Sequence, residues 1–216
     1  EEVLKYALEI GDVFVDRGAR AVIVACNSAA AAALDTLADR LPVPVLGVIE
    51  PGLRAAQRVT GSRRVGVIGT VGTIASGAYQ RVAARLDPTL VLTCAACPGF
   101  VEFVEAGDVE SDQVHVLAER LLAPLRSAGV DTLVLGCTHY PLLARTIGDV
   151  MGRDVVLVSS ADETAFEVRG RLGVSRPAAS PTAPRFVTSG DPAQFRRLGA
   201  RFLGPEVDVV EPWSWS

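Results

Sequence analysis

The chain has 216 residues, of which 49% are hydrophobic and 21% charged, and its formal net charge is −4. This composition is typical of a globular protein and excludes a fibrous or disordered one, and the acidic charge without a basic cluster argues against nucleic-acid binding. No apolar run reaches the roughly 18 residues of a membrane-spanning helix, and the acidic first residues lack signal-peptide features. We therefore expect a cytoplasmic protein with reduced cysteines and no membrane partner.

Short apolar runs alternate with helical segments along the whole chain. The predicted helices are 1–17, 29–41, 53–59, 74–86, 100–106, 111–128, 141–151, 161–172 and 192–202. The predicted strands are 21–25, 44–48, 64–68, 89–93, 130–136, 154–158, 185–188 and 207–210. Glu50-Pro51-Gly52 predicts a turn, and the Pro-, Ala- and Ser-rich stretch 175–184 predicts a loop.

Strands that alternate with helices predict an α/β fold, with parallel sheets that carry helices on both faces. We expect two similar lobes with pseudo-two-fold symmetry and an active site in the cleft between them. The first lobe is predicted to be discontinuous, comprising 1–50 and 159–216, and the second to comprise 51–158.

Two segments of the chain share one design. Each begins with a glycine, continues through a short apolar run and reaches a cysteine eight positions later, from Gly18 to Cys26 and from Gly129 to Cys137. The polar residues that follow at once are Asn27, Ser28, Thr138 and His139. Buried parallel strands end at the ligand-binding edge of an open sheet, and helix N-termini there favour thiolate. Both thiols are therefore expected at that edge.

Three roles are open to the paired cysteines. Each can be an inert small hydrophobe, or the two can join His139 in a catalytic zinc site, which the lack of a close ligand pair disfavours. They can also act as proton-transfer bases or nucleophiles. The recurrence of the unit favours this third role, since a thiolate facing a thiol across a cleft is what a two-base racemase requires.

The lysine content bears on the cofactor. Lys5 is the only lysine, and it lies on the predicted first helix, away from any strand end. Because a pyridoxal phosphate enzyme needs a lysine for its Schiff base, we expect no cofactor, and we predict no metal.

Three further features have ordinary interpretations. Cys94 and Cys97 form a Cys-x-x-Cys, but a Pro-Gly pair delays the helix that an active redox thiol should open, so buried or half-buried thiols are expected. The Gly- and Thr-rich segment 69–73 lacks the lysine of a P-loop and suits the carboxylate of a small ligand. His115 is expected on the surface of a helix.

The residues around both cysteines carry a family resemblance. Leu135-Gly136-Cys137-Thr138-His139-Tyr140-Pro141-Leu142-Leu143 resembles the second cysteine motif of the cofactor-independent glutamate racemases, within the aspartate/glutamate racemase superfamily. Val24-Ala25-Cys26-Asn27-Ser28-Ala29 resembles the first motif, with serine in place of the commoner threonine. Supporting stretches are 44–49, 66–70, 96–102 and 157–165.

The resemblance implies a function and a set of residues. Cys26 and Cys137 would exchange the roles of base and acid on opposite faces of glutamate, and Glu105, not Glu102, would assist together with His139. The residues implied around the substrate are Asn27, Ser28, Thr70, Thr73, Thr138 and His139. A homodimer that supplies D-glutamate for peptidoglycan synthesis is expected.

One departure accompanies the resemblance. The family opens with an Asp-Ser-Gly loop and carries a later Tyr-Gly loop, and neither occurs in the 216 residues. We therefore expect the first strands of the first lobe to precede Glu1. The open alternatives are a sister racemase or isomerase acting on aspartate, hydantoins or maleate, a metal-dependent hydrolase, and a non-catalytic ligand-binding lobe.

Overall fold

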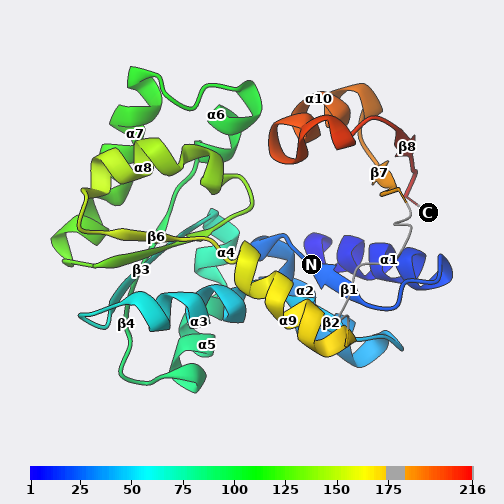
Figure 1. Ribbon diagram of the computed structural model, residues 1–216, viewed down its shortest axis with the longest axis horizontal. Helices are drawn as coiled ribbons and strands as arrows, with labels where there is room; N and C mark the ends of the chain where they lie inside the picture. The colour runs from blue at the N-terminus through cyan, green and yellow to red at the C-terminus, as the bar shows by residue number, and fades with distance from the viewer. Residues whose placement is uncertain (174–182, 216) are drawn as a thin grey trace. The chain divides into compact units, whose positions relative to one another are not determined.

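The computed structural model describes residues 1–173 and 183–215. The chain divides into two compact units, Glu1–Gly173 and Val174–Ser216. All strand pairings in the described residues are parallel, and strands alternate with helices along the chain (Figure 1). The predicted α/β class with parallel sheets is confirmed.

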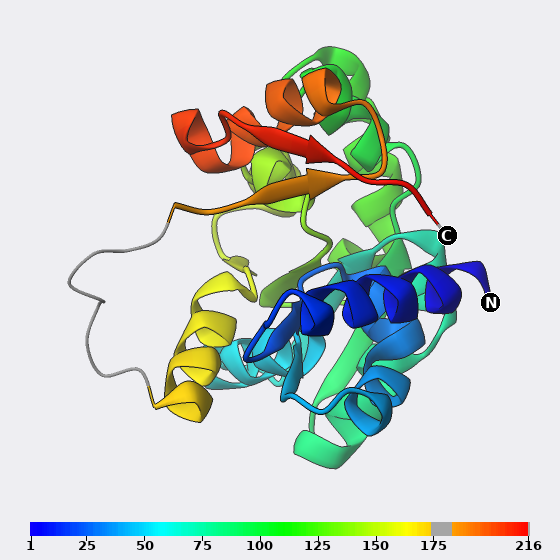
Figure 2. The ribbon, with the colours of Figure 1, turned by 90° about the vertical axis from the view of Figure 1, so that its right-hand side faces the viewer.

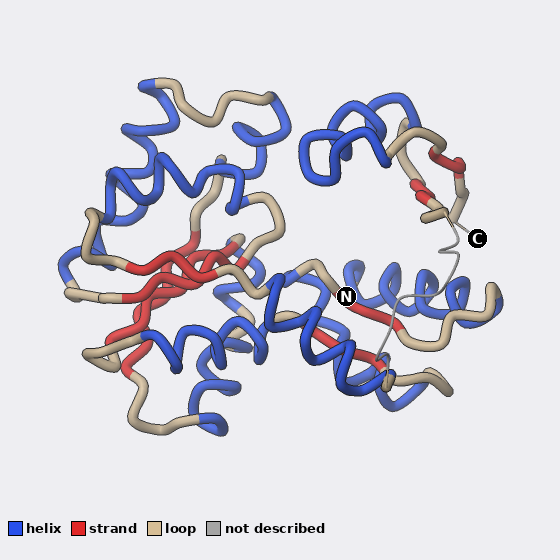
Figure 3. Tube along the Cα trace, viewed as in Figure 1, coloured by secondary structure: helices blue, strands red, loops and turns tan. Residues whose placement is uncertain are grey.

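The first unit contains a four-stranded sheet in the order β4-β3-β5-β6. Its strands are β3 (Arg64–Gly69), β4 (Val91–Ala96), β5 (Thr132–Gly136) and β6 (Val156–Val158). Figure 3 shows these strands between two layers of helices. One layer consists of α6 (Phe100–Ala106), α7 (Asp112–Ser127) and α8 (Ala144–Met151), and the other includes α3 (Ile49–Val59) and α5 (Ala78–Leu86).

Alternation along the central strands explains the two layers. Side chains of successive strand residues point to opposite faces of a sheet. Val134 therefore joins the apolar cluster that contains Leu53 and Tyr79, whereas Leu133 and Leu135 join the cluster beneath α7 and α8. All residues of β5, and all of β3 except Arg64, are buried, as expected for central parallel strands covered on both faces.

A second, two-stranded sheet precedes the larger one in the chain. It pairs β1 (Val22–Val24) with β2 (Val45–Gly47), and three helices accompany it: α1 (Glu2–Asp16), α2 (Asn27–Arg40) and α9 (Ala161–Leu172). Ala30, Ala33 and Leu37 bury one face of α2. Whether residues 1–50 and 159–216 together form one lobe stays a prediction.

The second unit is a small β-α-β arrangement. Strands β7 (Phe186–Thr188) and β8 (Val210–Pro212) pair in parallel, and α10 (Pro192–Leu203) with a short 3₁₀ turn (Gly204–Glu206) connects them (Figure 2). The Asp191 carboxylate accepts a hydrogen bond from the backbone N–H of Ala193, which caps α10 as expected for Asp before Pro. Most of the predicted loop 175–184 lies outside the described residues.

Two predicted boundaries within the first unit were wrong. Glu50-Pro51-Gly52 forms the first turn of α3 and not a turn between elements, because a proline there lacks only an N–H that has no acceptor within the helix. The predicted helix 74–86 is two helices, α4 (Val71–Ala75) and α5, which are separated where Gly77 adopts a φ of 67°.

Three further elements begin or end at other residues than predicted. Strand β4 ends at Ala96, so that Cys94 lies inside the strand. The first turn of the predicted helix 141–151 is a 3₁₀ turn, η1 (Tyr140–Leu143), before α8 begins. The last strand begins at Val210 and not at residue 207, since Val207 ends the 3₁₀ turn Gly204–Glu206.

Candidate active site

All nine predicted site residues lie in the first unit. Cys26 follows the end of β1 and is the N-cap residue of α2, where its carbonyl accepts from the backbone N–H of Ala30 at 2.8 Å. The Cys26 residue is exposed, whereas Asn27 is only 4% exposed. The predicted position of the first thiol, at a strand end and at the start of a long helix, is confirmed.

Three hydroxyl groups lie together beside this helix start. The Ser28 Oγ lies 2.8 Å from the Thr70 Oγ1 and 2.9 Å from the Thr73 Oγ1, and the two threonine oxygens are 3.0 Å apart. Thr70 directly follows β3 and caps α4 by accepting from the N–H of Thr73. We call Ser28, Thr70 and Thr73 the hydroxyl triad. It brings together residues that were predicted from two distant motifs.

Cys137 lies directly after β5, on the strand that pairs with β3. Gly136, which precedes it, pairs with Gly69, which precedes Thr70. Because the ends of adjacent parallel strands share one sheet edge, the second cysteine and the hydroxyl triad lie at the same edge. Only 8% of Cys137 is exposed. It is separated from α8 by η1, so the predicted adjacency to a full helix N-terminus was wrong for this cysteine.

A chain of polar contacts extends from Cys137 to Glu105. The Cys137 Sγ lies 3.9 Å from the His139 Nδ1, and the Thr138 Oγ1 lies 3.2 Å from the same nitrogen. The other ring nitrogen, Nε2, lies 3.2 Å from the Glu105 Oε1. The structure therefore places Glu105, on α6, beside His139. Such a carboxylate orients the imidazole ring.

The Cys137 thiol is held in its protonated form. Burial raises the pKa of Cys137, and a thiolate at Cys26 raises it further, while hydrogen bonds from the N–H groups of His139 and Tyr140 lower it only in part. The expected lowering of this pKa was wrong, because desolvation of the charged form outweighs the donors. Negative charge on Cys26 therefore disfavours negative charge on Cys137.

The remaining predicted features have the ordinary roles expected for them. Burial raises the pKa of Cys94 to about 11 and that of Cys97 to about 12, so neither is the reactive thiolate of a redox pair. His115 lies on α7, 3.8 Å from Glu119, and both side chains are substantially exposed.

Tyr79 was missed in the sequence. Its hydroxyl, on α5, donates to the Asn27 Oδ1 at 2.8 Å, and the residue is 1% exposed. A tyrosine on the apolar face of a helix is indistinguishable from core packing in the sequence alone. The only signal was its place a few residues after the Gly- and Thr-rich segment.

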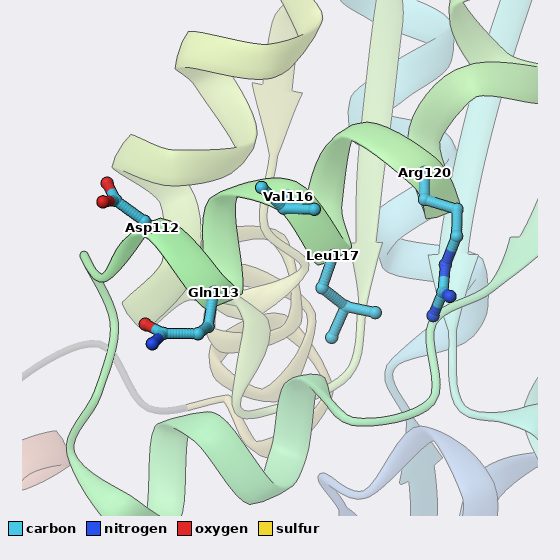
Figure 4. Close-up of a pocket in the computed structure, with 5 residues that line it drawn as sticks. All are labelled: Asp112, Gln113, Val116, Leu117 and Arg120. Carbon is cyan, nitrogen blue, oxygen red and sulfur yellow. The ribbon is translucent and has the colours of Figure 1, made fainter.

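Neither a metal cluster nor a membrane helix is found in residues 1–173 and 183–215. No three His, Cys, Asp or Glu side chains there group to hold a metal ion, and no helix there is long and apolar enough to cross a membrane. A pocket of about 440 Å³ lies on α7 (Figure 4). It is lined by Asp112, Gln113, Val116, Leu117 and Arg120, none of which is a predicted site residue.

Comparison with known proteins identifies the family. Residues 4–167 match the family described as Asp/Glu/hydantoin racemase. The chain belongs to this family. It is 52% identical over 213 residues to a glutamate racemase of Parafrankia sp., a match that covers 97% of this chain and 77% of that protein.

Solved racemase structures resemble the chain over nearly its full length. A glutamate racemase isoform of Bacillus anthracis is 38% identical with a TM-score of 0.90, covering 100% of this chain and 80% of the other. The glutamate racemase of Francisella tularensis, solved in complex with D-glutamate, is 28% identical with a TM-score of 0.87, covering 99% and 80%. The family membership and the fold thus agree.

Proposed function

We propose that this protein interconverts L- and D-glutamate and supplies D-glutamate for peptidoglycan synthesis. The observation that carries the proposal is identity of 52% to a glutamate racemase across 97% of the chain, together with two cysteines that each follow a strand end. It is an isomerase that acts on the Cα–H bond of an amino acid.

The reaction is a two-base proton transfer. One cysteine thiolate takes the Cα proton and becomes a thiol, while the C–H electron pair stays on the substrate. The thiol of the other cysteine donates its proton to the opposite face and becomes a thiolate. The effect of Cys26 charge on the pKa of Cys137 suits this cycle, because it disfavours the state in which both cysteines are thiolates. Exchange with solvent restores the starting protonation state.

The neighbouring residues bind the substrate and stabilise developing charge. The hydroxyl triad, Asn27 and Thr138 supply neutral donors and acceptors for the amino and carboxylate groups. His139, oriented by Glu105, supplies a polar ring nitrogen at the Cys137 side. Preorganised donors of this kind stabilise charge that appears in the transition state, and closure over a small amino acid would exclude water.

The wider organisation belongs to the same proposal. Residues 1–50 with 159–216 form one lobe and 51–158 form the other, the two are related by pseudo-two-fold symmetry, and the substrate binds in the cleft between them. The enzyme works as a cytoplasmic homodimer. Support comes from the repeated strand–cysteine units and from the similarity to other racemases over nearly the whole chain.

The test is substitution of each cysteine in the full-length protein. Cys26→Ser and Cys137→Ser should each lower racemisation at least about 100-fold, the lower range of acid–base catalysis, as followed by chiral chromatography. Each variant should still exchange the Cα proton with D2O from one enantiomer only. Cys94→Ser is the matched control and should retain activity, since that thiol lies within β4.

Three outcomes would contradict the proposal. Full racemisation by either single variant would refute the two-base mechanism. Faster turnover of aspartate or a hydantoin than of glutamate would assign a sister activity in the same family. Binding of D-glutamate in calorimetry without turnover by the wild type would indicate a binding protein.

A further inference from the structure

One buried tyrosine contacts both strand–cysteine units. The Tyr79 hydroxyl donates to the carbonyl oxygen of the Asn27 side chain at 2.8 Å, and Asn27 directly follows Cys26. The same hydroxyl fills the space beside Gly136, which directly precedes Cys137. A Cβ built on Gly136 would lie 2.8 Å from the Tyr79 oxygen and 2.6 Å from the Ile68 carbonyl oxygen.

The contact determines the orientation of the Asn27 amide. The oxygen and nitrogen of an amide are fixed in one plane, so holding the oxygen in a buried hydrogen bond also sets the direction of the nitrogen. Among the described residues, the contact with Tyr79 is the only hydrogen bond of the Asn27 side chain, and the Asn27 nitrogen is not among the fully buried polar atoms that lack a partner. The Asn27 N–H groups are thus the donors that remain for a ligand.

The hydroxyl stays protonated throughout the working pH range. Burial raises the pKa of Tyr79 far above its ordinary value, and charge on Cys94 or Cys137 raises it further. Because the phenol remains neutral, its O–H continues to donate to Asn27 whichever cysteine carries the negative charge. It can therefore hold the amide in place through both halves of a proton transfer.

We propose that Tyr79 is a positioning residue for racemisation, whose hydroxyl orients the Asn27 amide toward the substrate and holds it in register with the Cys137 strand end. This inference rests on the proposed function. Tyr79 acts through Asn27 and does not touch the reacting atoms. Gly136 makes this contact possible, since a side chain at position 136 would clash with the Tyr79 hydroxyl.

The experiment is a double-mutant cycle in the full-length protein. Tyr79→Phe retains the ring and removes the hydrogen bond, so kcat should fall about tenfold while KM changes less, as for the loss of one oriented donor. In an Asn27→Ala background, Tyr79→Phe should change kcat less than twofold. A purely structural role would give equal losses in both backgrounds. Tyr6→Phe removes an exposed hydroxyl that donates to Glu2 on α1; it is the matched control and should be unchanged.

A second measurement does not depend on the folding of Tyr79→Phe. With 3-fluorotyrosine placed at position 79, the ¹⁹F resonance should shift on saturation with D-glutamate, and Asn27→Ala should abolish that shift. An unmoved resonance, or a kcat of Tyr79→Phe equal to wild type, overturns the positioning role alone. A wild-type enzyme that does not racemise glutamate overturns the proposed function and this inference with it.

Discussion

Substitution of Ser28 by alanine tests the hydroxyl triad directly. The Ser28 hydroxyl makes two hydrogen bonds, at 2.8 and 2.9 Å, and each contributes about 0.5–1.5 kcal/mol net. Thr70 and Thr73 remain bonded to each other at 3.0 Å after the change. We therefore expect the free energy of unfolding to fall by about 1–2 kcal/mol, which corresponds to a Tm lower by about 2–8 °C.

The effect on activity should be larger than the effect on stability. If the triad binds a charged group of glutamate, the loss of one such hydrogen bond costs about 1.5–3 kcal/mol and lowers kcat/KM by about 10- to 150-fold. The assay is chiral chromatography of L- and D-glutamate, with thermal unfolding followed by circular dichroism. Ser28→Thr retains the hydroxyl and should stay within about threefold of wild type.

The result that would refute this reasoning is specific. A Ser28→Ala enzyme with a kcat/KM within twofold of wild type, and with the expected loss of Tm, would show that the triad is only structural. Equal losses in Ser28→Ala and Ser28→Thr would contradict the assignment of the effect to the hydroxyl.

Three further substitutions probe other parts of the first unit. Glu105→Gln should lower kcat up to about fivefold, because a half-exposed pair with His139 contributes at most about 1 kcal/mol. The control Glu102→Gln, also on α6, should have no effect. Equal losses of kcat in the two variants, measured in steady-state assays, would contradict the pairing of Glu105 with His139. Gly136→Ala should destabilise by about 1–3 kcal/mol in urea unfolding, since its Cβ would meet the Ile68 carbonyl oxygen at 2.6 Å, whereas Gly72→Ala, with open space around it, should not. Asp131→Asn should destabilise the protein near neutral pH but not in acid: although burial acts to raise the pKa of Asp131, hydrogen bonds from Thr60, Ser62 and Thr132 hold it far below its usual range. Its contribution is therefore complete above the unfolded value of about 3.9 and is lost progressively as pH falls from there through the much lower folded pKa. The difference between the urea unfolding curves of variant and wild type should therefore begin to shrink below about pH 4, and a constant difference would contradict the shift.

Local chemistry made several elements predictable. Strands β3 and β5 are apolar runs because both faces are covered, so their composition alone marks them as buried. Helix α7 begins where the Ser111 hydroxyl accepts from the N–H of Val114, an interaction within one helical turn. Both cysteines were predictable as strand-end residues because each follows a short apolar run.

Boundaries that depend on neighbouring elements were not predictable in this way. Pro51 and Gly52 are typical of turns, yet Gly52 lies in α3 because its missing side chain admits Ser160: a Cβ built there would lie 3.2 Å from the Ser160 Cβ. The end of β4 at Ala96 depends on its pairing with Gly69. Neither partner is close in sequence.

The candidate site was likewise predictable only in part. The residue types and the motifs of Cys26 and Cys137 identified the members of the site one by one. The contacts between these residues could not be predicted from the sequence, because the triad joins side chains 42 and 45 positions apart. The protonated state of Cys137 also depends on how deeply the fold buries it.

The sequence by itself determined the α/β class, the strand-end position of the two cysteines and the family, because periodicity, strand-end position and motif are local properties of the chain. Only the tertiary structure decided that Glu105 meets His139, that three hydroxyls share hydrogen bonds, and that Tyr79 ties Asn27 to the Gly136 strand end. These contacts join residues after β1 to residues of a different sheet and join a helix to a strand end, so they depend on packing among segments far apart in the chain.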